Sequence, residues 1–312
     1  MKATLHYRAG PNLLRMIGAL PEGVEIAVAD PGDDAALTTA LADSDMLLHV
    51  LEPVTAAMMD AAPRLKLIQK IGVGIDAIDV AAARARGIAV CNIPGANTAA
   101  VAEMTLALIF ACLRRIPLLS AETKAGTGWT VSGLIGDGLG ELGGRTVGLV
   151  GYGAVARRLA PVLTALGAKV VAFARRPAED GTALLPLDKL LHRSDIVSLH
   201  LPVNDETRNL LDARRIGLMK PGAILVNTAR GGLVDQSALV EALRDARIAA
   251  AGLDVFAAEP PLADDPLLAL PNVVATPHVA WLTGETLSRS LEIVVENARR
   301  LAAGEPLLHR VA

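Results

Sequence analysis

In the second half of the chain, three short apolar runs typical of β-strands are each followed by a residue that could do acid–base or anion-binding chemistry. They are Arg230 after 223–226, Glu259 after 248–253 and His278 after 273–275. A guanidinium can bind a carboxylate, an imidazole can exchange a proton near neutral pH, and a carboxylate can keep that imidazole charged and oriented. Because ligands bind outside the carboxyl ends of the strands in an open α/β sheet, we expect these side chains to line one crevice. Beside a nicotinamide ring, they would suffice to reduce a 2-oxo acid.

A glycine-rich turn predicts where the nucleotide binds. The strand-type run 146–150 leads into Gly151-Tyr152-Gly153-Ala154-Val155-Ala156, which is GxGxxG with alanine in the third position, and a helix-type segment follows. Gly151 permits the tight turn and Gly153 lets the backbone approach a pyrophosphate. The free N–H groups and partial positive charge of the helix N-terminus would bind the phosphates. The sequence therefore predicts a dinucleotide site.

The end of the next strand predicts which dinucleotide is preferred. The run 169–173 ends in Ala174-Arg175-Arg176, where sites that prefer NAD usually place an acidic residue to hold the ribose hydroxyls. Arginine instead forms charge-assisted, bidentate bonds with phosphate. We expect NADP(H) to be preferred, with NAD(H) as the alternative cofactor. Under the competing interpretation, Arg175 and Arg176 are solvated surface residues.

The elements that must position these residues alternate between strand-type and helix-type runs, which predicts parallel sheets. We expect an α/β protein of two domains. A Rossmann-type, doubly wound cofactor domain is predicted over 98–279. A smaller, flavodoxin-like substrate domain is predicted over 1–97 and 280–312, because a last helix over 285–302 would return to the first domain. The glycine-rich stretch 120–144 is predicted to be a long arm or loop.

Composition narrows the class of protein. Of the 312 residues, 52% are hydrophobic and 2% aromatic, the net charge is −3, and no basic block suggests nucleic-acid binding. Cys91 and Cys112 lie in apolar runs and are expected to be reduced thiols. No apolar stretch reaches the roughly 20 residues that span a membrane, and no secretory pattern opens the chain. We expect a cytoplasmic protein with no membrane partner, and no metal site, since no His or Cys cluster has ligand spacing.

Several strings in this sequence resemble the D-isomer-specific 2-hydroxyacid dehydrogenase family, in order and over nearly the whole chain. They are ELGGRTVGLVGYG at 141–153, NTARGGLVD at 227–235, GLDVF at 252–256, TPHVA at 276–280 and the segment 95–115. The resemblance implies that Arg230 anchors the substrate carboxylate, that His278 is the acid/base and that Glu259 is its partner. It also implies a homodimer, with the arm around Trp129 as the contact.

Further site residues follow from the same resemblance. The cofactor contacts that it implies are Gly151, Gly153, Ala154, Val155, Leu201, Thr228, Ala229, Arg230, Asp254, His278 and Ala280. The expected substrate contacts are Val73, Gly74, Arg230, His278 and Trp281. Trp281 could equally be packing between domains. Each of the main site residues also has a competing structural interpretation. These are a loop cation for Arg230, the start of a turn for Glu259, a structural imidazole for His278 and a loop cap for Asp254.

The expected reaction is hydride transfer from the reduced cofactor to a small 2-oxo acid, giving the D-2-hydroxy acid, with His278 as proton donor. The glyoxylate/hydroxypyruvate class is favoured because the loop 49–53 carries Glu52 and no arginine, and Lys70 is the one nearby cation. The chain also leaves no room for the regulatory domain of many phosphoglycerate dehydrogenases. The alternatives are a family member acting on a larger or phosphorylated 2-hydroxy acid and a nucleotide-sensing corepressor of the same fold.

Overall fold

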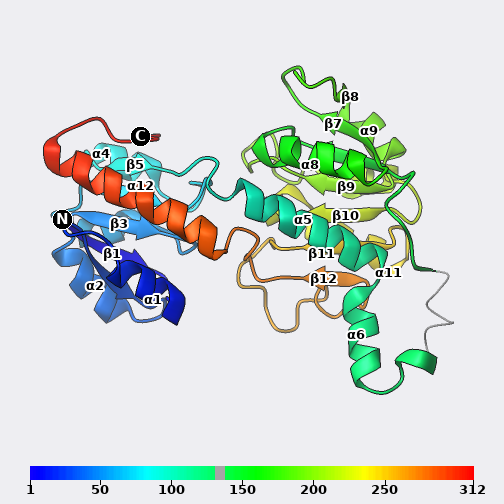
Figure 1. Ribbon diagram of the computed structural model, residues 1–312, viewed down its shortest axis with the longest axis horizontal. Helices are drawn as coiled ribbons and strands as arrows, with labels where there is room; N and C mark the ends of the chain where they lie inside the picture. Colours follow the sequence, from blue (N-terminus) through cyan, green and yellow to red (C-terminus); the bar gives the residue numbers. More distant parts are fainter. Residues whose placement is uncertain (131–137) are drawn as a thin grey trace. The chain divides into compact units, whose positions relative to one another are not determined.

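The computed structural model describes residues 1–130 and 138–312, which form two compact units. Unit 1 comprises Met1–Asn97 together with Trp281–Ala312, and unit 2 is the continuous stretch Thr98–Ala280. Both are α/β structures built on a parallel sheet (Figure 1). The predicted fold class is therefore confirmed. Ala280 belongs to unit 2, one residue beyond the range expected for the cofactor domain.

Unit 1 has a five-stranded parallel sheet in the order β2-β1-β3-β4-β5. Its strands are β1 (Lys2–His6), β2 (Glu25–Ala29), β3 (Met46–His49), β4 (Leu67–Lys70) and β5 (Ala89–Cys91). Its helices are α1 (Pro11–Gly18), α2 (Asp34–Ala42), α3 (Ala56–Asp60), α4 (Val80–Ala85) and α12 (Gly284–Ala303). Strands β3 and β4 are buried throughout, as expected for inner strands covered on both faces.

The C-terminal helix α12 belongs to unit 1 because a buried amide ties it to the sheet. Asn297 donates from Nδ2 to Oε1 of Gln69 on β4, at 2.7 Å, and its Oδ1 accepts from the backbone of Leu308 at 2.7 Å. The helix starts at the side-chain cap of Thr283 and ends at Gly304, whose φ of 67° suits glycine. The last helix expected from the sequence is thus present, slightly longer than 285–302.

Unit 2 has a seven-stranded parallel sheet in the order β12-β11-β10-β9-β6-β7-β8, with helices on both faces. Its strands are β6 (Thr146–Val150), β7 (Lys169–Phe173), β8 (Ala183–Leu184), β9 (Ile196–Leu199), β10 (Ile224–Asn227), β11 (Ala250–Leu253) and β12 (Val273–Ala275). Its helices are α5 (Thr98–Leu113), α6 (Ile116–Lys124), α8 (Ala154–Ala165), α9 (Leu187–Arg193), α10 (Ala213–Leu218) and α11 (Gln236–Arg244). Apolar residues of α5 and α8 form one core and those of α9, α10 and α11 another, which is the doubly wound arrangement.

The prediction for 120–144 is partly wrong. Helix α6 occupies 116–124, started by Pro117 in its first turn, so the expected loop begins with helix. Residues 131–137 of that stretch lie outside the described residues. Within 1–130 and 138–312, no single helix is long and apolar enough to cross a membrane, and the pair α5 and α6, bent by 63°, passes that test by length and composition only.

Candidate active site

Arg230, Glu259 and His278 all lie in unit 2, after the carboxyl ends of three adjacent strands. Strands β10, β11 and β12 are neighbours in the sheet, and their last residues Asn227, Leu253 and Ala275 lie level with one another. The chain therefore leaves all three strands at the same edge. This is the edge at which open α/β sheets bind ligands.

His278 and Glu259 form a direct pair. Nδ1 of the imidazole lies 2.5 Å from Oε2 of Glu259, and both side chains remain partly exposed. The other carboxylate oxygen, Oε1, accepts a hydrogen bond from the backbone N–H of Phe256 at 2.9 Å. Because both oxygens of Glu259 are held, the carboxylate fixes the orientation of the imidazole ring and directs Nε2 away from the pair.

Electrostatics tie Arg230 to this pair. Burial alone would raise the pKa of Glu259, but the hydrogen bond and charge of His278, the Phe256 amide and the charge of Arg230 outweigh it and hold the pKa below its ordinary value. Glu259 is therefore ionised at neutral pH and places a negative charge against the imidazole of His278. The structure thus brings His278 and Glu259 into direct contact and places Arg230 near enough for its charge to act on Glu259.

Asp254 holds the turn that carries His278. This buried carboxylate accepts from the backbone of Val279 at 2.9 Å through Oδ1 and from Ala280 at 2.8 Å through Oδ2, and Oδ1 also accepts from Oγ1 of Thr276 at 2.6 Å. Its backbone carbonyl accepts from the N–H of His278 at 2.8 Å. Desolvation raises the pKa of Asp254 against the opposing effect of these hydrogen bonds. His278 itself has a φ of 54°, so the surrounding bonds must stabilise a left-handed residue that is not glycine.

Asn227 positions Arg230 and was not anticipated from the sequence. This buried side chain at the end of β10 accepts from the N–H of Ala229 at 3.0 Å and donates to the carbonyl of Arg230 at 2.8 Å. It thereby closes the turn from which the guanidinium projects. Thr228 in the same turn lies 2.9 Å, Oγ1 to Oγ1, from Thr105 of α5. The available signal was an amide residue at the end of a buried strand, which is a common way to shape a turn.

Gly231 lets the turn after β10 touch the turn after β11. A Cβ atom at this position would lie 1.9 Å from the carbonyl carbon and oxygen of Phe256, which no side chain can occupy. Phe256 is the residue whose N–H holds Glu259. The glycine that follows Arg230 therefore brings the backbone of the arginine turn against the backbone that supports the His278–Glu259 pair.

The turn between β6 and α8, residues 151–153, is the predicted nucleotide site and is called the nucleotide turn. It contains two glycines with different roles. Gly151 has a φ of 97°, and a Cβ there would lie 2.6 Å from the carbonyl oxygen of His200, so both backbone conformation and packing require glycine. Gly153 has an ordinary φ of −88°, and a Cβ there would meet no protein atom within 4 Å. Gly153 begins α8, whose first-turn N–H groups include those of Ala154 and Val155. Within residues 1–130 and 138–312 no neighbouring atom demands glycine at position 153, which fits the close approach of a pyrophosphate.

Arg175 lies beside this turn, and it has an acidic partner. The N–H of Gly151 donates to the carbonyl of Phe173 at 2.9 Å, which joins the end of β7 to the nucleotide turn. Two residues on, Nη1 of Arg175 lies 3.2 Å from Oε2 of Glu206, a residue of the segment after β9. Arg176 is exposed, and Leu201 lies two residues after the end of β9. Glu206 was not anticipated, since 31 residues separate it from Arg175 in the sequence.

Val73, Gly74 and Trp281 belong to unit 1. Val73 and Gly74 follow β4, and the carbonyl of Val73 accepts from Nδ2 of Asn92 at 2.9 Å. The side chain of Trp281 is only 7% exposed and its ring meets that of Tyr7 edge-on, with centroids 6.2 Å apart. Trp281 thus packs against Tyr7 within unit 1. Contact of these three residues with substrate stays a prediction.

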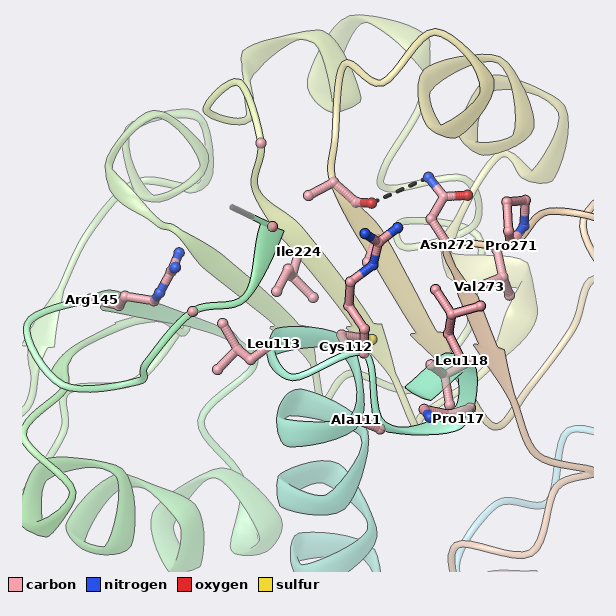
Figure 2. A pocket seen from close by; sticks show the side chains of 17 residues that line it. Ala111, Cys112, Leu113, Pro117, Leu118, Arg145, Ile224, Pro271, Asn272 and Val273 are labelled. Atoms are coloured by element: carbon pink, nitrogen blue, oxygen red, sulfur yellow. Dashed lines mark hydrogen bonds between the residues drawn. The ribbon is translucent and has the colours of Figure 1, made fainter. Parts of the chain in front are cut away.

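Unit 2 contains a hollow of about 280 Å³ (Figure 2). It is lined at the first residues of β10, β11 and β12 and at the end of α5, so it opens at the amino edge of the sheet. Figure 2 shows Arg145, Cys112 and Asn272 around it. It is therefore separate from the candidate site at the carboxyl edge. Over residues 1–130 and 138–312, no group of three His, Cys, Asp or Glu side chains could hold a metal ion.

Comparison with known proteins agrees with this geometry. A family model described as "D-isomer specific 2-hydroxyacid dehydrogenase, NAD binding domain" matches residues 106–280. The chain is 42% identical over 295 residues to D-3-phosphoglycerate dehydrogenase from Mycobacterium bovis, covering 93% of this chain and 55% of that protein. It is 40% identical over 272 residues to glyoxylate reductase from Korarchaeum cryptofilum, covering 84% and 81%.

A solved structure extends the comparison to the fold. The NADPH-dependent glyoxylate/hydroxypyruvate reductase from Sinorhizobium meliloti, in complex with NADP and malonate, matches with a TM-score of 0.84 and 31% identity, covering 100% of this chain and 96% of that one. The chain spans about half the length of the phosphoglycerate dehydrogenase that it matches.

Proposed function

Because the chain belongs to the D-isomer-specific 2-hydroxyacid dehydrogenase family, we propose that it reduces a small 2-oxo acid to the D-2-hydroxy acid with a nicotinamide cofactor. The observation that carries this proposal is the 2.5 Å contact between His278 and Glu259, with Arg230 close enough to lower the pKa of that glutamate. An anion-binding cation and a paired imidazole are the two groups that such a reduction requires of the protein.

The residues divide the reaction between them. A bound nicotinamide supplies the hydride. Arg230 binds the substrate carboxylate with its planar guanidinium and fixes the carbonyl for attack, an effect of positioning. His278 gives a proton to the carbonyl oxygen as negative charge develops there, and takes it back in the oxidative direction. Glu259 keeps the imidazole charged and oriented through Nδ1, so that Nε2 is the nitrogen that faces the reacting oxygen.

The cofactor is proposed to bind at the nucleotide turn. Gly151, Gly153, Ala154 and Val155 would hold the pyrophosphate, which is supported by the unfilled space around Gly153. The remaining proposed contacts are Leu201, Thr228, Ala229, Asp254 and Ala280. Arg175 and Arg176 are proposed to favour NADP(H) by binding the 2′-phosphate.

The substrate is proposed to be glyoxylate or hydroxypyruvate, with Val73, Gly74 and Trp281 as further contacts. The similarity to a glyoxylate reductase over most of both chains supports this class. A phosphorylated 2-oxo acid is the second candidate, favoured by the 42% identity to a phosphoglycerate dehydrogenase. The two candidates differ by two negative charges at the far end of the substrate.

The decisive experiment follows reduced nicotinamide absorbance with glyoxylate, hydroxypyruvate and phosphohydroxypyruvate, each with NADPH and NADH. We expect turnover with the first two substrates and its near abolition in His278→Ala. The matched control is His192→Ala, which removes an exposed imidazole of α9 and should leave turnover unchanged. Nucleotide binding without turnover of any 2-oxo acid would instead favour the corepressor-like alternative.

We further propose a homodimer in the cytoplasm. Trp129 is 83% exposed, and none of the residues of the neighbouring helix α6 is buried. An indole this exposed is unusual unless another surface covers it. The two cysteines are free and buried, which suits a reducing compartment.

A further inference from the structure

The Arg175–Glu206 pair joins loops from the two sides of the nucleotide-binding strand. Strand β6 lies between β7 and β9 in the sheet, and Arg175 follows β7 while Glu206 follows β9. The two side chains reach toward each other, with 3.2 Å between Nη1 and Oε2. Both side chains are about three-quarters exposed, at 76% and 74%. A negative charge is thus held beside the very guanidinium that is proposed to bind a 2′-phosphate.

The backbone that carries Glu206 is well fixed. Oδ1 of Asn204 accepts from the N–H of Glu206 at 3.0 Å and from the N–H of Thr207 at 3.1 Å. Oγ1 of the buried Thr207 donates to the carbonyl of Pro202 at 2.7 Å. These bonds form a compact turn of the kind that asparagine shapes. The backbone of Glu206 is therefore held at a defined place beside Arg175, although its side chain is exposed.

This place is chemically significant because β7 ends without an acid. In sites that prefer NAD, a carboxylate at the end of that strand accepts from the ribose hydroxyls and repels a 2′-phosphate. Ala174 stands directly after Phe173 here, so the strand itself supplies no such group. Glu206 brings a carboxylate to the same neighbourhood from the other side of β6.

We propose that Glu206 is a specificity-determining residue that restrains the preference for NADP(H) by occupying Arg175. This inference rests on the proposed function and deepens it, since it assigns the choice of cofactor to a competition for one guanidinium. A phosphate that binds Arg175 must displace Glu206, whereas a nucleotide with a free 2′-hydroxyl need not. The pair is exposed, so its effect is moderate and screened by salt.

The test measures nucleotide binding directly by calorimetry on the full chain, with adenosine 2′,5′-bisphosphate and 5′-AMP as probes. We expect Glu206→Gln to tighten binding of the bisphosphate by about three- to tenfold at low ionic strength, with little change for AMP. The gain should shrink when the salt concentration is raised to about 0.5 M. Asp205→Asn is the matched control, because it removes the same charge from the adjacent residue, which forms no ion pair with Arg175 in the described chain.

A second variant shows whether Glu206 acts through Arg175. Arg175→Gln should weaken binding of the bisphosphate, and in that background Glu206→Gln should change its affinity less than twofold. The inference is overturned if Glu206→Gln leaves the ratio of the two affinities unchanged, if Asp205→Asn reproduces its effect, or if the effect persists in full without Arg175. If the wild-type chain binds neither nucleotide, the proposed function itself fails, and this inference fails with it.

Discussion

Asp254 and Ala280 are joined by a hydrogen bond of 2.8 Å from the backbone N–H of Ala280 to Oδ2 of the buried carboxylate. The same carboxylate accepts from Val279 and Thr276, so the residues on both sides of His278 are held by one side chain. A carboxylate only accepts hydrogen bonds, and three of its positions are already used within the chain. Its first role is therefore to fix the turn that carries His278, the proposed acid/base residue.

Asp254→Asn should lower kcat by about ten- to a hundredfold, because the new NH2 group would face a backbone N–H and loosen the turn of His278. The dissociation constant for NADPH, measured by fluorescence, should change little. Asp195→Asn is the matched control, since Asp195 also accepts from a backbone N–H, that of Thr146, but at the amino edge of the sheet. The Asp195→Asn variant should have a lower free energy of unfolding and an unchanged kcat. A large loss of NADPH affinity in Asp254→Asn with kcat retained would favour a cofactor contact over a positioning role.

Glu259→Gln should move the pH dependence of reduction. The amide cannot stabilise the imidazolium by charge, so the rate should begin to fall at a lower pH than in the wild type. At acid pH the wild-type pair should persist, because the pKa of Glu259 is held below its ordinary value. The stability that ionised Glu259 contributes is fully present above the ordinary glutamate pKa. It is lost as the pH falls through the lowered pKa of Glu259 in the folded chain. Rate–pH profiles of kcat/KM check this, and an unshifted profile would remove Glu259 from its role.

Substitution of Gly231 should affect mainly folding, whereas substitution of Gly153 should affect mainly nucleotide binding. Gly231→Ala forces a Cβ into the backbone of Phe256, so we expect a large loss of stability or failure to fold. Gly153→Ala meets no protein atom, so the melting temperature should change little while affinity for NADPH falls at least tenfold. Thermal denaturation and a binding titration on both variants provide the comparison. Full affinity in Gly153→Ala would show that no ligand approaches that position.

His200 should make unit 2 sensitive to acid. Burial lowers the pKa of His200 to about 4, against an ordinary value near 6.5. Between these values the unfolded chain binds the proton and the folded chain does not, so stability is complete above about pH 6.5 and falls as pH drops toward 4, by about 1.4 kcal/mol per unit. Urea unfolding at pH 7, 6 and 5 gives the free energy of unfolding at each pH. This free energy should fall less steeply with decreasing pH in His200→Gln than in the wild type. His192→Gln, at an exposed position, should retain the wild-type slope.

Trp129→Ser should weaken the proposed dimer. The indole is 83% exposed within one chain, so its removal should cost the monomer little stability while it deprives an interface of a large apolar side chain. Analytical ultracentrifugation across a range of concentrations should show a dimer for the wild type and a larger dissociation constant for the variant. A monomeric wild type at all concentrations would contradict the proposal.

Much of the fold could be predicted from the sequence because buried parallel strands are short apolar runs. Strands such as β3 and β9 are buried along their whole length, and their sequences leave little ambiguity. Short helices were harder to predict. Helices α9 and α10 have seven and six residues, too few for a helical repeat of apolar positions to stand out, and they are set by caps and packing.

The residues of the candidate site also differ in whether the sequence alone could predict their roles. Arg230, Glu259 and His278 could be found because each follows a recognisable strand, and the rule for strand ends brings them together. Glu206 as a partner of Arg175, and Asp254 as the acceptor for Val279 and Ala280, depend on contacts between segments far apart in the sequence. No spacing rule reports such contacts, since they arise from how loops meet after the strands are placed. Asn227 instead shapes its own turn, since its side chain bonds with Ala229 and Arg230.

The uninterrupted span of Thr98–Ala280 has a consequence for how substrate range could diversify. The His278–Glu259 pair, Arg230 and the glycine turn at 151–153 are all encoded within that single stretch, flanked by the two segments that form unit 1. The proposed substrate contacts Val73, Gly74 and Trp281 lie in the flanking segments. Chimaeras that take both flanking segments from a relative are therefore expected to change in substrate preference and to keep their preference for one nicotinamide cofactor.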